Sequence, residues 1–458
     1  MGRNQVAKVC RLNTASKVEK MKYYLAIDIG ASSGRHIVGW LDRNEIQTEE
    51  VYRFRNGTKM QNKHQVWDLD SLFEHVKKGI KAAFSKYPDI QSLAIDTWGV
   101  DYALMTDGGR LDPCFSYRDN RTDQAVEEVH RIVPFEELYA RTGAQFQPFN
   151  TIYQLFDDLQ KKRLTIATDF LMLPEYLNER LTGVKMHEYT NATTTGLVNV
   201  RTKNYDMDLL DRLGLPKRLF GRLYQPGASV GRLKPEIVRE TGGQTEVVLC
   251  ASHDTASAVE GIPMDGNNPY ISSGTWSLLG LKVSNAITDA DSREANFTNE
   301  GGVGYTRYQK NIMGMWVVNC LKEELCPERP LSQIVEEARH SAFNDFVNID
   351  DRAFLSPKRM KDAFDAQLKG KRKPQSESDY FRCAFMSLAV SYRNALDELK
   401  KNSGKEFDTL YIVGGGAKNR LLNGLTEQIC KIKVKAIPIE ATAIGNLKIQ
   451  IGRKENVR

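Results

Sequence analysis

Two stretches of small polar residues are places where this chain could bind phosphate. The first, AIDIGASSGR, spans residues 26–35 and follows an apolar run with Asp28, two glycines and two serines. Small residues leave backbone N–H groups uncovered, and successive N–H groups in such a turn form a concavity that suits an anion. The same residues are ordinary hairpin-turn residues, so this stretch alone is compatible with either role.

The second stretch lies in the other half of the chain and repeats the pattern. Residues 268–283 read NPYISSGTWSLLGLKV, an apolar strand, a Ser/Gly/Thr turn and another apolar strand. A later segment, VGGGAKN, joins a strand to glycines that open a helix, an arrangement that binds nucleotides at the carboxyl ends of strands. Because neither GxGxxG nor GxxxxGK[ST] is complete, the dinucleotide dehydrogenase and P-loop interpretations lose support, and a duplicated nucleotide clamp is predicted.

Two aspartates could serve phosphoryl transfer. Asp28 ends a buried strand, and Mg²⁺ prefers one or two carboxylates together with phosphate oxygens and water; a turn aspartate that accepts local N–H groups is the alternative. Asp254, in ASHDTA, stands where a strand ends and a helix begins, so it could face a cleft or could cap the helix. A carboxylate with an ordinary pKa of about 3.9 is ionised at neutral pH and can orient a hydroxyl and accept its proton.

Composition narrows the class of protein. The chain has 458 residues, 41% hydrophobic and 27% charged, which is typical of an ordinary globular protein of two or three domains. Its net charge of +6 is spread without a long basic block, which suits an anionic substrate better than nucleic acid. Seven cysteines without CxxC pairs indicate reduced thiols and a cytoplasmic location, and no apolar run approaches a membrane span. Residues 1–21 are expected to be a loose extension, with Met21 the natural start.

The elements that must position these residues begin with strands and continue with alternating helices and strands. Apolar runs at 23–29 and 35–42 flank the first turn, and a strand, a turn and a strand are expected in SLAIDTWGVDYALM. A helix is expected to begin at SLFE, where Ser71 and Glu74 make a capping box. Residues 120–230 show helical periodicity in three segments: DQAVEEVHRIV, TIYQLFDDLQKK and DFLMLPEYLNERLTG. This order predicts a mixed α/β domain.

The second half of the chain repeats that organisation. It contains a long amphipathic helix pattern, YFRCAFMSLAVSYRNALDELKK, and expected strands in TLYIV and IKVKAIP. The boundary between the halves is expected at Gly261 to Asn268, where IPMDGNNP interrupts the periodicity.

The motifs together resemble the superfamily of sugar kinases, actin and heat-shock ATPases, and within it the FGGY carbohydrate kinases. The resemblance runs from residue 26 to about 446, and its stretches are DIGASSGR, RFRNG, WDLDSL, IDTWGVD, YRDNRT, FNTIYQL, EYTNATTT, ASHDTASAV, SSGTWS, NEGG, KNIMG, VGGGAKN and EATAIGN. It implies a two-lobed, duplicated α/β fold of the actin-like, ribonuclease H-like type. The first lobe is expected at 22–262, with the sugar site and first phosphate loop, and the second at 263–458, with the second phosphate loop and the adenosine site.

The resemblance also implies ATP and Mg²⁺ as cofactors, with Asp28 beside the metal and Asp254 as catalytic base. The residues expected at the nucleotide are Ala31, Ser32, Ser33, Gly34, Arg35, Thr275, Asn319 and Gly415. The residues expected at the sugar are Gly99, Asp101, His253, Asp254, Thr255 and Asn311. Thr275 and Gly415 could instead be tight turns, His253 a structural neighbour, and Trp98, next to the expected sugar turn, a core residue. Asn319 stands where a relative has a glutamine.

Within the family, the resemblance is greatest to members that phosphorylate the 1-hydroxyl of L-rhamnulose with MgATP; the sugar is implied by resemblance alone. The alternatives are a kinase for another ketose, such as fuculose or xylulose, and a non-catalytic actin-like nucleotide switch. After EATAIGN the chain ends in QIGRKENVR, whereas relatives continue through further helical sequence, and stability is expected to suffer first if that segment packs on the second lobe.

Overall fold

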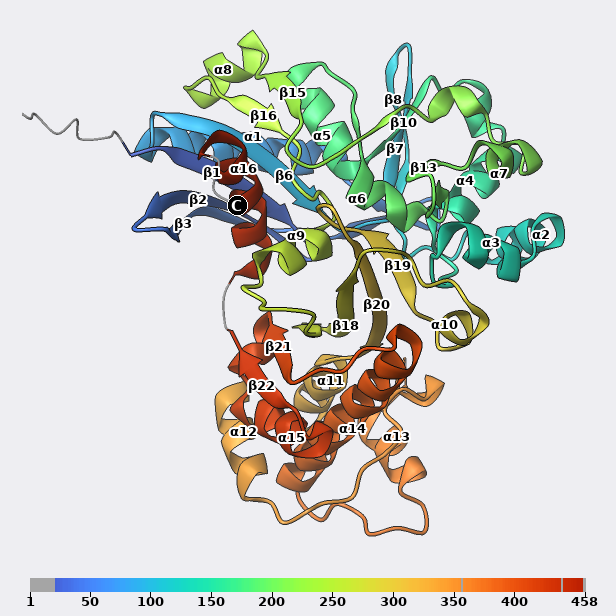
Figure 1. Ribbon diagram of the computed structural model, residues 1–458, viewed down its shortest axis with the longest axis vertical. Helices are drawn as coiled ribbons and strands as arrows, with labels where there is room; N and C mark the ends of the chain where they lie inside the picture. Colours follow the sequence, from blue (N-terminus) through green and yellow to red (C-terminus); the bar gives the residue numbers. More distant parts are fainter. Residues whose placement is uncertain (1–20, 356, 438–439, 456–458) are drawn as a thin grey trace, which may run out of the picture.

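Two lobes, each built on a six-stranded mixed sheet, make up the molecule (Figure 1). The computed structural model describes residues 21–355, 357–437 and 440–455. The expected N-terminal extension, with Cys10, lies outside the described residues, apart from Met21. The six cysteines within the described ranges are all free thiols, as the sequence predicts. In these ranges no helix is both long and apolar enough to span a bilayer.

The first sheet has the order β15-β16-β6-β1-β2-β3. β1 runs parallel to β6 and antiparallel to β2, and β6 runs parallel to β16. Every residue of β1 after Tyr23 is buried, as expected for a central strand covered on both faces. The strands are β1 (Tyr23–Ile29), β2 (Ser33–Asp42), β3 (Glu45–Arg55), β6 (Ile90–Thr97), β15 (Ser229–Arg232) and β16 (Glu246–Val248).

The second sheet has the order β22-β21-β17-β18-β20-β19 and repeats the first. β17 runs antiparallel to β18 and parallel to β21, as β1 does to β2 and β6. Five strands of each sheet therefore correspond in order and direction, which confirms the predicted duplication. The strands are β17 (Tyr270–Ser273), β18 (Trp276–Val283), β19 (Thr298–Gly301), β20 (Thr306–Met313), β21 (Thr409–Val413) and β22 (Lys433–Ala436).

Helix α1 (Leu69–Lys86) covers the first sheet but begins earlier than expected. Asp68 caps it, because the Asp68 carboxylate accepts a hydrogen bond from Ser71 N at 3.1 Å. The predicted Ser71–Glu74 capping box is therefore wrong: Ser71 already lies inside the helix, and Glu74 forms an ion pair with Lys77. One face of the helix is apolar and buried; its residues are Leu72, Val76, Ile80, Ala83 and Phe84.

The region between β6 and β15 forms a mainly helical extension of the first lobe with its own apolar core. The expected helix over DFLMLPEYLNERLTG is wrong in its first part, because residues 169–172 form strand β10, which pairs with β7. The helix begins only at Leu173, with Pro174 in its first turn. The elements are β7 (Tyr102–Thr106), β8 (Gly109–Leu111), α2 (Asp123–Ile132), α3 (Phe135–Thr142), α4 (Thr151–Gln160), β10 (Asp169–Met172), α5 (Leu173–Thr182), β11 (His187–Glu188), α6 (Tyr189–Ala192), β12 (Val198–Asn199), β13 (Asn204–Tyr205), α7 (Met207–Arg212) and β14 (Leu223–Tyr224).

The remaining elements complete the lobes. In the first lobe they are β4 (Thr58–Gln61), β5 (His64–Trp67), β9 (Cys114–Phe115) and α8 (Pro235–Thr241). In the second lobe they are α10 (Ala290–Glu294), α11 (Trp316–Leu325), α12 (Leu331–His340), α13 (Met360–Gln367), α14 (Glu377–Ser403) and α15 (Arg420–Cys430). α14, the long amphipathic helix expected from the sequence, is buried over much of its length against the second sheet and α15.

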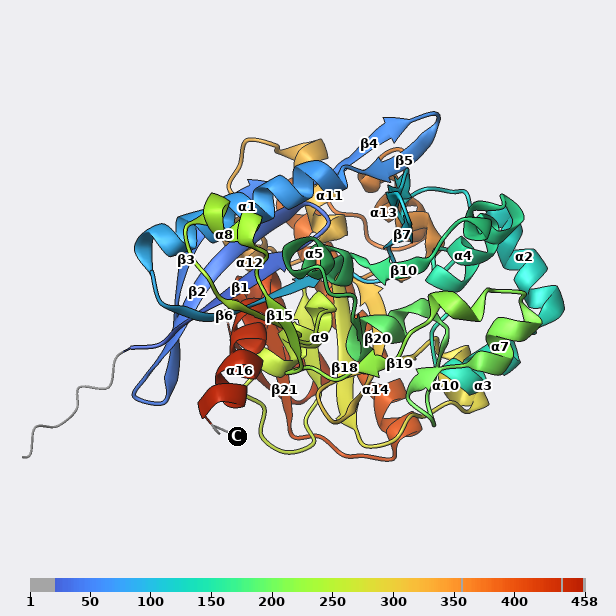
Figure 2. The ribbon, with the colours of Figure 1, turned by 90° about the horizontal axis from the view of Figure 1, so that it is seen from above.

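Two crossing helices join the lobes, α9 (Asp254–Gly261) and α16 (Ala441–Glu455). α9 lies between the two sheets, and α16 returns to the first lobe, where it covers β1 and β6 (Figures 1 and 2). Leu447 packs on Tyr24 in that contact, and Gln450 bonds Leu25 O. By its packing α16 thus belongs with the first lobe, although its residues fall in the range expected for the second.

Candidate active site

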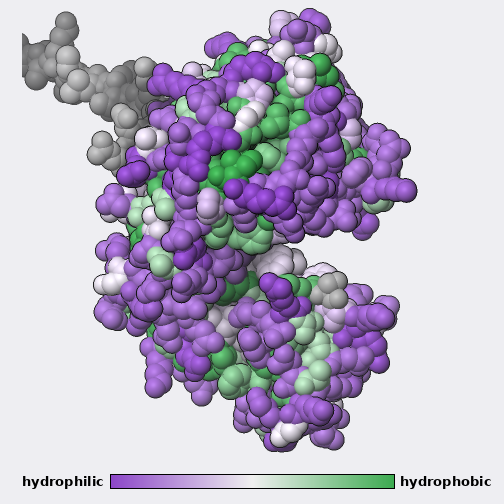
Figure 3. All heavy atoms as spheres, turned by 90° about the vertical axis from the view of Figure 1, so that its right-hand side faces the viewer, coloured by the Kyte–Doolittle hydropathy of each residue, from purple (hydrophilic) through white to green (hydrophobic). Residues whose placement is uncertain are grey.

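The site lies where β1, β6 and α9 converge between the lobes. Asp28 and Asp96 are register partners at the ends of the parallel strands β1 and β6. His253, just before α9, forms a bridge to Thr97, and Thr97 N donates to Ser252 O at 2.9 Å. Parallel strands present their carboxyl ends at one edge, so the topology brings Asp28, Asp96 and Asp254 together. The surface is deeply hollowed between the lobes, which leaves room for a ligand that touches both (Figure 3).

Asp28 is a buried carboxylate paired with Arg35 of β2. Arg35 Nη2 lies 2.8 Å from Asp28 Oδ2, and its other terminal nitrogen bonds Glu440, which precedes α16. Burial raises the pKa of Asp28, and the guanidinium of Arg35 opposes that rise. Arg35 thus balances the charge of Asp28. It also lies just after the turn that is expected to hold phosphates.

Asp96 is a site residue that the sequence analysis missed. It is fully buried; Oδ2 accepts from Asn446 Nδ2 at 2.6 Å, while Oδ1 has no partner. Burial, reinforced by the neighbouring Asp28, raises the pKa of Asp96 well above its ordinary value. A signal was available: residues 25–28 and 93–96 both read LAID, which marks two equivalent neighbouring strands that end in the same acid.

The first phosphate loop has the expected compact turn. Gly30 N donates to Ser33 O at 2.9 Å, and Ser32 is exposed at the turn. Ala31 and Ser33 are half-buried, so Ser32 is the exposed residue of this turn, which follows the strand that carries Asp28. Gly34 differs from the rest, since it is buried in β2 and a Cβ there would lie 2.2 Å from the Phe54 ring. It serves the packing of β2 against β3.

The second phosphate loop and the glycine loop adjoin one another in the second lobe. Thr275 is exposed in the β17–β18 turn, where Gly274 N donates to Trp276 O at 2.9 Å. A Cβ on Gly416 would lie 2.0 Å from Ser273 Oγ, so the two loops are in direct contact. Gly415 is exposed, with no heavy atom within 4 Å of the position its Cβ would take.

Asn319 lies on α11, the helix that begins at this second phosphate loop. Trp316 N, in the first turn of α11, donates to Thr275 O at 3.0 Å, and Asn319 is exposed one turn later. Thr275, Asn319 and Gly415 therefore occupy neighbouring exposed positions of the second lobe. They remain the residues of the second lobe that are predicted to lie at the nucleotide.

Asp254 is the first residue of α9, and its carboxylate remains about a third exposed, at 30%. The helix N-cap is His253, so the capping alternative for Asp254 is wrong. Its Oδ1 accepts from Thr255 N at 2.6 Å and from Thr255 Oγ1 at 3.2 Å, which fixes one oxygen and leaves Oδ2 for a ligand. Thr255 thus orients Asp254 in this structure.

Glu188, also missed from the sequence, anchors the segment before Asp254. It is fully buried, and its carboxylate accepts from Ser252 Oγ at 2.6 Å, from Thr190 N at 2.7 Å and from Asn191 N at 3.0 Å. Burial raises the pKa of Glu188 despite these donors. The motif EYTNATTT therefore supports the His253–Asp254 turn through Glu188.

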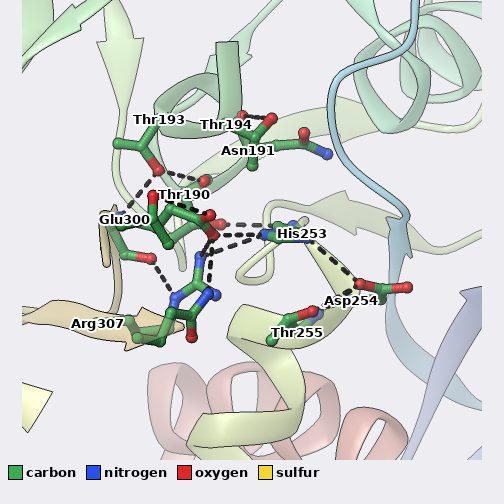
Figure 4. A network of polar contacts seen from close by, with 12 residues as sticks. Thr190, Asn191, Thr193, Thr194, His253, Asp254, Thr255, Glu300 and Arg307 are labelled. Atoms are coloured by element: carbon green, nitrogen blue, oxygen red, sulfur yellow. Dashed lines mark hydrogen bonds and ion pairs between the residues drawn. The ribbon is translucent and has the colours of Figure 1, made fainter. Parts of the chain in front are cut away.

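Three of the expected sugar residues lie next to one another at the start of α9, whereas Asn311 and Gly99 come from other parts of the chain. His253, Asp254 and Thr255 lie together at the start of α9 (Figure 4). Asn311 lies on β20, half-buried, and its Oδ1 has no hydrogen-bond partner. Gly99 is buried against Thr194, whose side chain would be 2.9 Å from an added Cβ.

Asp101 is not placed to hold a sugar, and this prediction needs correction. The residue is fully buried; Oδ2 accepts from Trp67 Nε1 at 2.6 Å and Trp98 Nε1 at 2.9 Å, and Oδ1 accepts from Gln154 Nε2 at 3.3 Å. Burial raises its pKa to about 6, against the opposing hydrogen bonds. Asp101 therefore holds the two indoles, and Trp98 is a core residue packed on Trp67.

The donor set suits Mg²⁺ held jointly with phosphate. Among the described residues no group of three or more His, Cys, Asp or Glu side chains is arranged to hold a metal unaided. Asp28, with the unpartnered Oδ1 of Asp96 nearby, offers the one or two carboxylates that Mg²⁺ takes when phosphates and water complete its shell.

Two corresponding sheets, each with a small-residue turn between its paired antiparallel strands, define a two-lobed protein of the actin-like ATPase fold. Solved structures agree: gluconate kinase from Lactobacillus acidophilus superimposes with a TM-score of 0.79 at 18% identity, covering 96% of this chain and 90% of that one. Plasmodium falciparum glycerol kinase with ADP gives a TM-score of 0.76 at 15% identity, covering 96% and 90%.

The chain belongs to the FGGY family of carbohydrate kinases. The family's N-terminal domain matches residues 23–261 and its C-terminal domain residues 269–451. The rhamnulokinase of Oceanobacillus iheyensis is 43% identical, covering 93% of this chain and 92% of that protein. The rhamnulokinase of Halalkalibacterium halodurans is 42% identical, covering 96% of each. Membership in a kinase family does not favour the non-catalytic switch.

Proposed function

We propose that this protein transfers the γ-phosphoryl group of ATP to the 1-hydroxyl of L-rhamnulose, giving L-rhamnulose 1-phosphate and ADP. The observation that carries the reaction type is the convergence of Asp28, Asp96 and Asp254 in a protein whose two lobes each carry one phosphate-type turn. The sugar follows from the relatives named rhamnulokinase, which are 38 to 43% identical over most of the chain. An enzyme that consumes ATP in sugar breakdown belongs in the cytoplasm.

In this mechanism Asp254 orients the sugar hydroxyl in line with the terminal phosphorus. A bond forms between the sugar O1 and that phosphorus, the bond from the phosphorus to the bridging oxygen of ADP breaks, and the hydroxyl proton passes to Asp254. A bound Mg²⁺, for which Asp28 is the assigned carboxylate, would neutralise charge on the phosphates. Because the transition state of phosphoryl transfer is loose, the base needs only to orient the hydroxyl and take its proton late.

The nucleotide side of the proposal rests on loops from both lobes. Ala31 to Ser33 and Arg35 would face the phosphates from the first lobe, and Thr275 from the second. Gly415 and Asn319 are assigned to the adenosine side, where both are exposed. Exposed backbone N–H groups in such turns are suited to phosphate oxygens.

A panel of purified ketoses tests the substrate. ADP release would be measured with MgATP and L-rhamnulose, L-fuculose or D-xylulose, and the highest kcat/KM is expected for L-rhamnulose. Strong activity on another ketose without activity on L-rhamnulose would replace the substrate but keep the reaction type. No ADP release with any sugar would overturn the proposed function.

A further inference from the structure

A line of polar side chains connects the catalytic aspartate to the second lobe (Figure 4). His253 Nε2 lies 3.5 Å from Asp254 Oδ1, and His253 Nδ1 lies 3.2 Å from Glu300 Oε2. Glu300 in turn forms an ion pair with Arg307 at 2.9 Å. Glu300 comes from β19 and Arg307 from β20, so the ring next to the base is held by residues of the other lobe.

Glu300 is built into the interior between the lobes. It is 9% exposed, and Arg307 is completely buried. Arg307 Nε donates to Gly301 O at 2.9 Å, and Gly301 N donates to Thr193 Oγ1 at 2.9 Å, which ties β19 to the first lobe. The carboxylate therefore has little freedom to move relative to His253.

The charge state of Glu300 follows from its neighbours. Burial alone would raise its pKa, but the guanidinium of Arg307 and the hydrogen bond from His253 outweigh burial and lower the pKa to about 2. An ionised carboxylate can only accept hydrogen bonds. Gln309 Nε2 donates to Glu300 Oε2 at 3.2 Å, and Arg307 Nη2 lies 2.9 Å from the same oxygen, so both of these partners are donors.

The two nitrogens of His253 consequently face different surroundings. Nδ1 faces Glu300 and the guanidinium of Arg307, whose Nη2 is also 3.2 Å away. Nε2 faces Asp254 at the mouth of the site. When Nδ1 of a neutral ring carries the proton toward Glu300, Nε2 is left as an acceptor for a sugar hydroxyl beside Asp254, which is the logic by which a carboxylate orients a catalytic histidine.

We propose that Glu300 is a positioning residue for sugar phosphorylation: it keeps the proton on His253 Nδ1 and fixes the ring so that Nε2 faces the sugar beside Asp254. The substrate side of this inference rests on the proposed function, whereas the state of the ring does not. Glu300 acts through His253 and does not touch the sugar itself. A residue on the second lobe thereby helps to set the geometry of the base on the first.

The ligand-free protein gives the first test. In protein labelled with ¹⁵N-histidine, long-range ¹H–¹⁵N spectra report which ring nitrogens are protonated, and the His253 signal is the one lost in His253→Gln. A protonated Nδ1 in wild type that becomes unprotonated or exchanges in Glu300→Gln supports the proposal. An unprotonated Nδ1 in wild type, as expected if Arg307 is its donor, overturns it. This result is independent of which sugar is phosphorylated.

Kinetics give the second test, and a double-mutant cycle separates positioning from mere stability. Glu300→Gln is expected to lower kcat/KM for the sugar by about 10- to 100-fold, the loss usual when a partner that orients a metal-binding histidine is removed, with KM for ATP unchanged. In a His253→Gln background the same change should cause no further loss. An equal loss in both backgrounds overturns the proposal.

Control variants keep the test decisive. Glu294→Gln, an exposed glutamate on the neighbouring helix α10, is expected to leave kcat/KM unchanged. If Glu300→Gln does not fold, the cycle is run with Glu300→Asp, which keeps the charge beside Arg307 but draws the carboxylate away from His253. Failure of wild type to phosphorylate any ketose would defeat the proposed function and leave the ¹⁵N result to judge the role of Glu300.

Discussion

At the scale of single residues, Asp254 carries the largest expected effect. Its carboxylate is half-buried, with one oxygen bonded to Thr255 and the other available to a hydroxyl. Asp254→Asn keeps the shape of the side chain but removes its capacity to take a proton. We expect turnover to fall by about 10² to 10⁴, the usual contribution of a general base, with ATP affinity preserved.

The measurement pairs steady-state ADP release with calorimetric titration of ATP. Asp265→Asn is the matched control, because Asp265 is highly exposed in the segment that follows α9 and should leave turnover unaltered. Wild-type turnover in Asp254→Asn would rule out a general base at this position. Loss of ATP binding in the same variant would point to a misfolded site instead.

Single residues also show how far sequence predicts a site. Asp28 and Asp254 were recognisable because each stands at the junction of an apolar strand and a small-residue turn. Glu188 and Glu300 were not, since their roles depend on partners distant in the chain. Asp96 was marked only by the repeated LAID, and the sequence did not reveal its bond to Asn446. The assignment of Asp101 to the sugar failed for a related reason.

Asp101 lies in the same DTWGVD segment as Trp98, and nothing in that segment reveals which side chains turn inward. Its carboxylate meets Trp67 from an earlier strand and Gln154 from a later helix. Burial of a polar group with internal donors is a tertiary property, so the local sequence could not distinguish a sugar ligand from a structural anchor.

At the scale of elements, periodicity predicted helices and strands well and their ends less well. The start of α1 was misplaced because Asp68 competes with Ser71 as a cap, and both are good capping residues. The strand β10 was taken for helix because its apolar run leads directly into α5, and only its pairing with β7 makes it a strand. Tertiary contacts decided both cases.

The crossing of α9 and α16 is the element contact most sensitive to substitution. A Cβ on Gly445 would lie 1.8 Å from Ser257 O, and one on Gly261 would lie 2.0 Å from Ala441 O. Such backbone contacts cannot be relieved by a rotamer change. We expect Gly445→Ala to lower the free energy of unfolding by at least about 1–3 kcal/mol, the usual effect of overpacking, measured by urea denaturation.

Gly424 supplies the control for helix propensity. It lies within α15, and no heavy atom is within 4 Å of the position its Cβ would take. Gly424→Ala should therefore be neutral or stabilise by about 0.5–1 kcal/mol, because alanine is the better helix former. A stable Gly445→Ala protein would show that the two helices can separate without penalty, contrary to their packing here.

At the scale of the whole molecule, duplication explains why two lobes are needed. The repeated sheets each supply one phosphate-type turn, and α9 places Asp254, the proposed base, between the two sheets. The sequence revealed this duplication because the two turns are repeated as local motifs. It did not reveal that α16 closes back on β1, since that contact joins the ends of the chain.

Closure of the lobes is the expected consequence of binding both substrates. A γ-phosphate left open to water would be hydrolysed, so transfer requires the hollow in Figure 3 to be covered. Trp276 and Trp316, beside the second phosphate loop, are 44% and 37% exposed and should lose that exposure on closure.

In Asp254→Asn, a non-hydrolysable ATP analogue with L-rhamnulose should reduce the radius of gyration measured by X-ray scattering and shift tryptophan emission to shorter wavelength. Trp276→Phe with Trp316→Phe should abolish the emission shift but not the compaction. An unchanged radius with both ligands bound would mean that the lobes already have their reactive spacing, and water exclusion would then have to come from the loops alone.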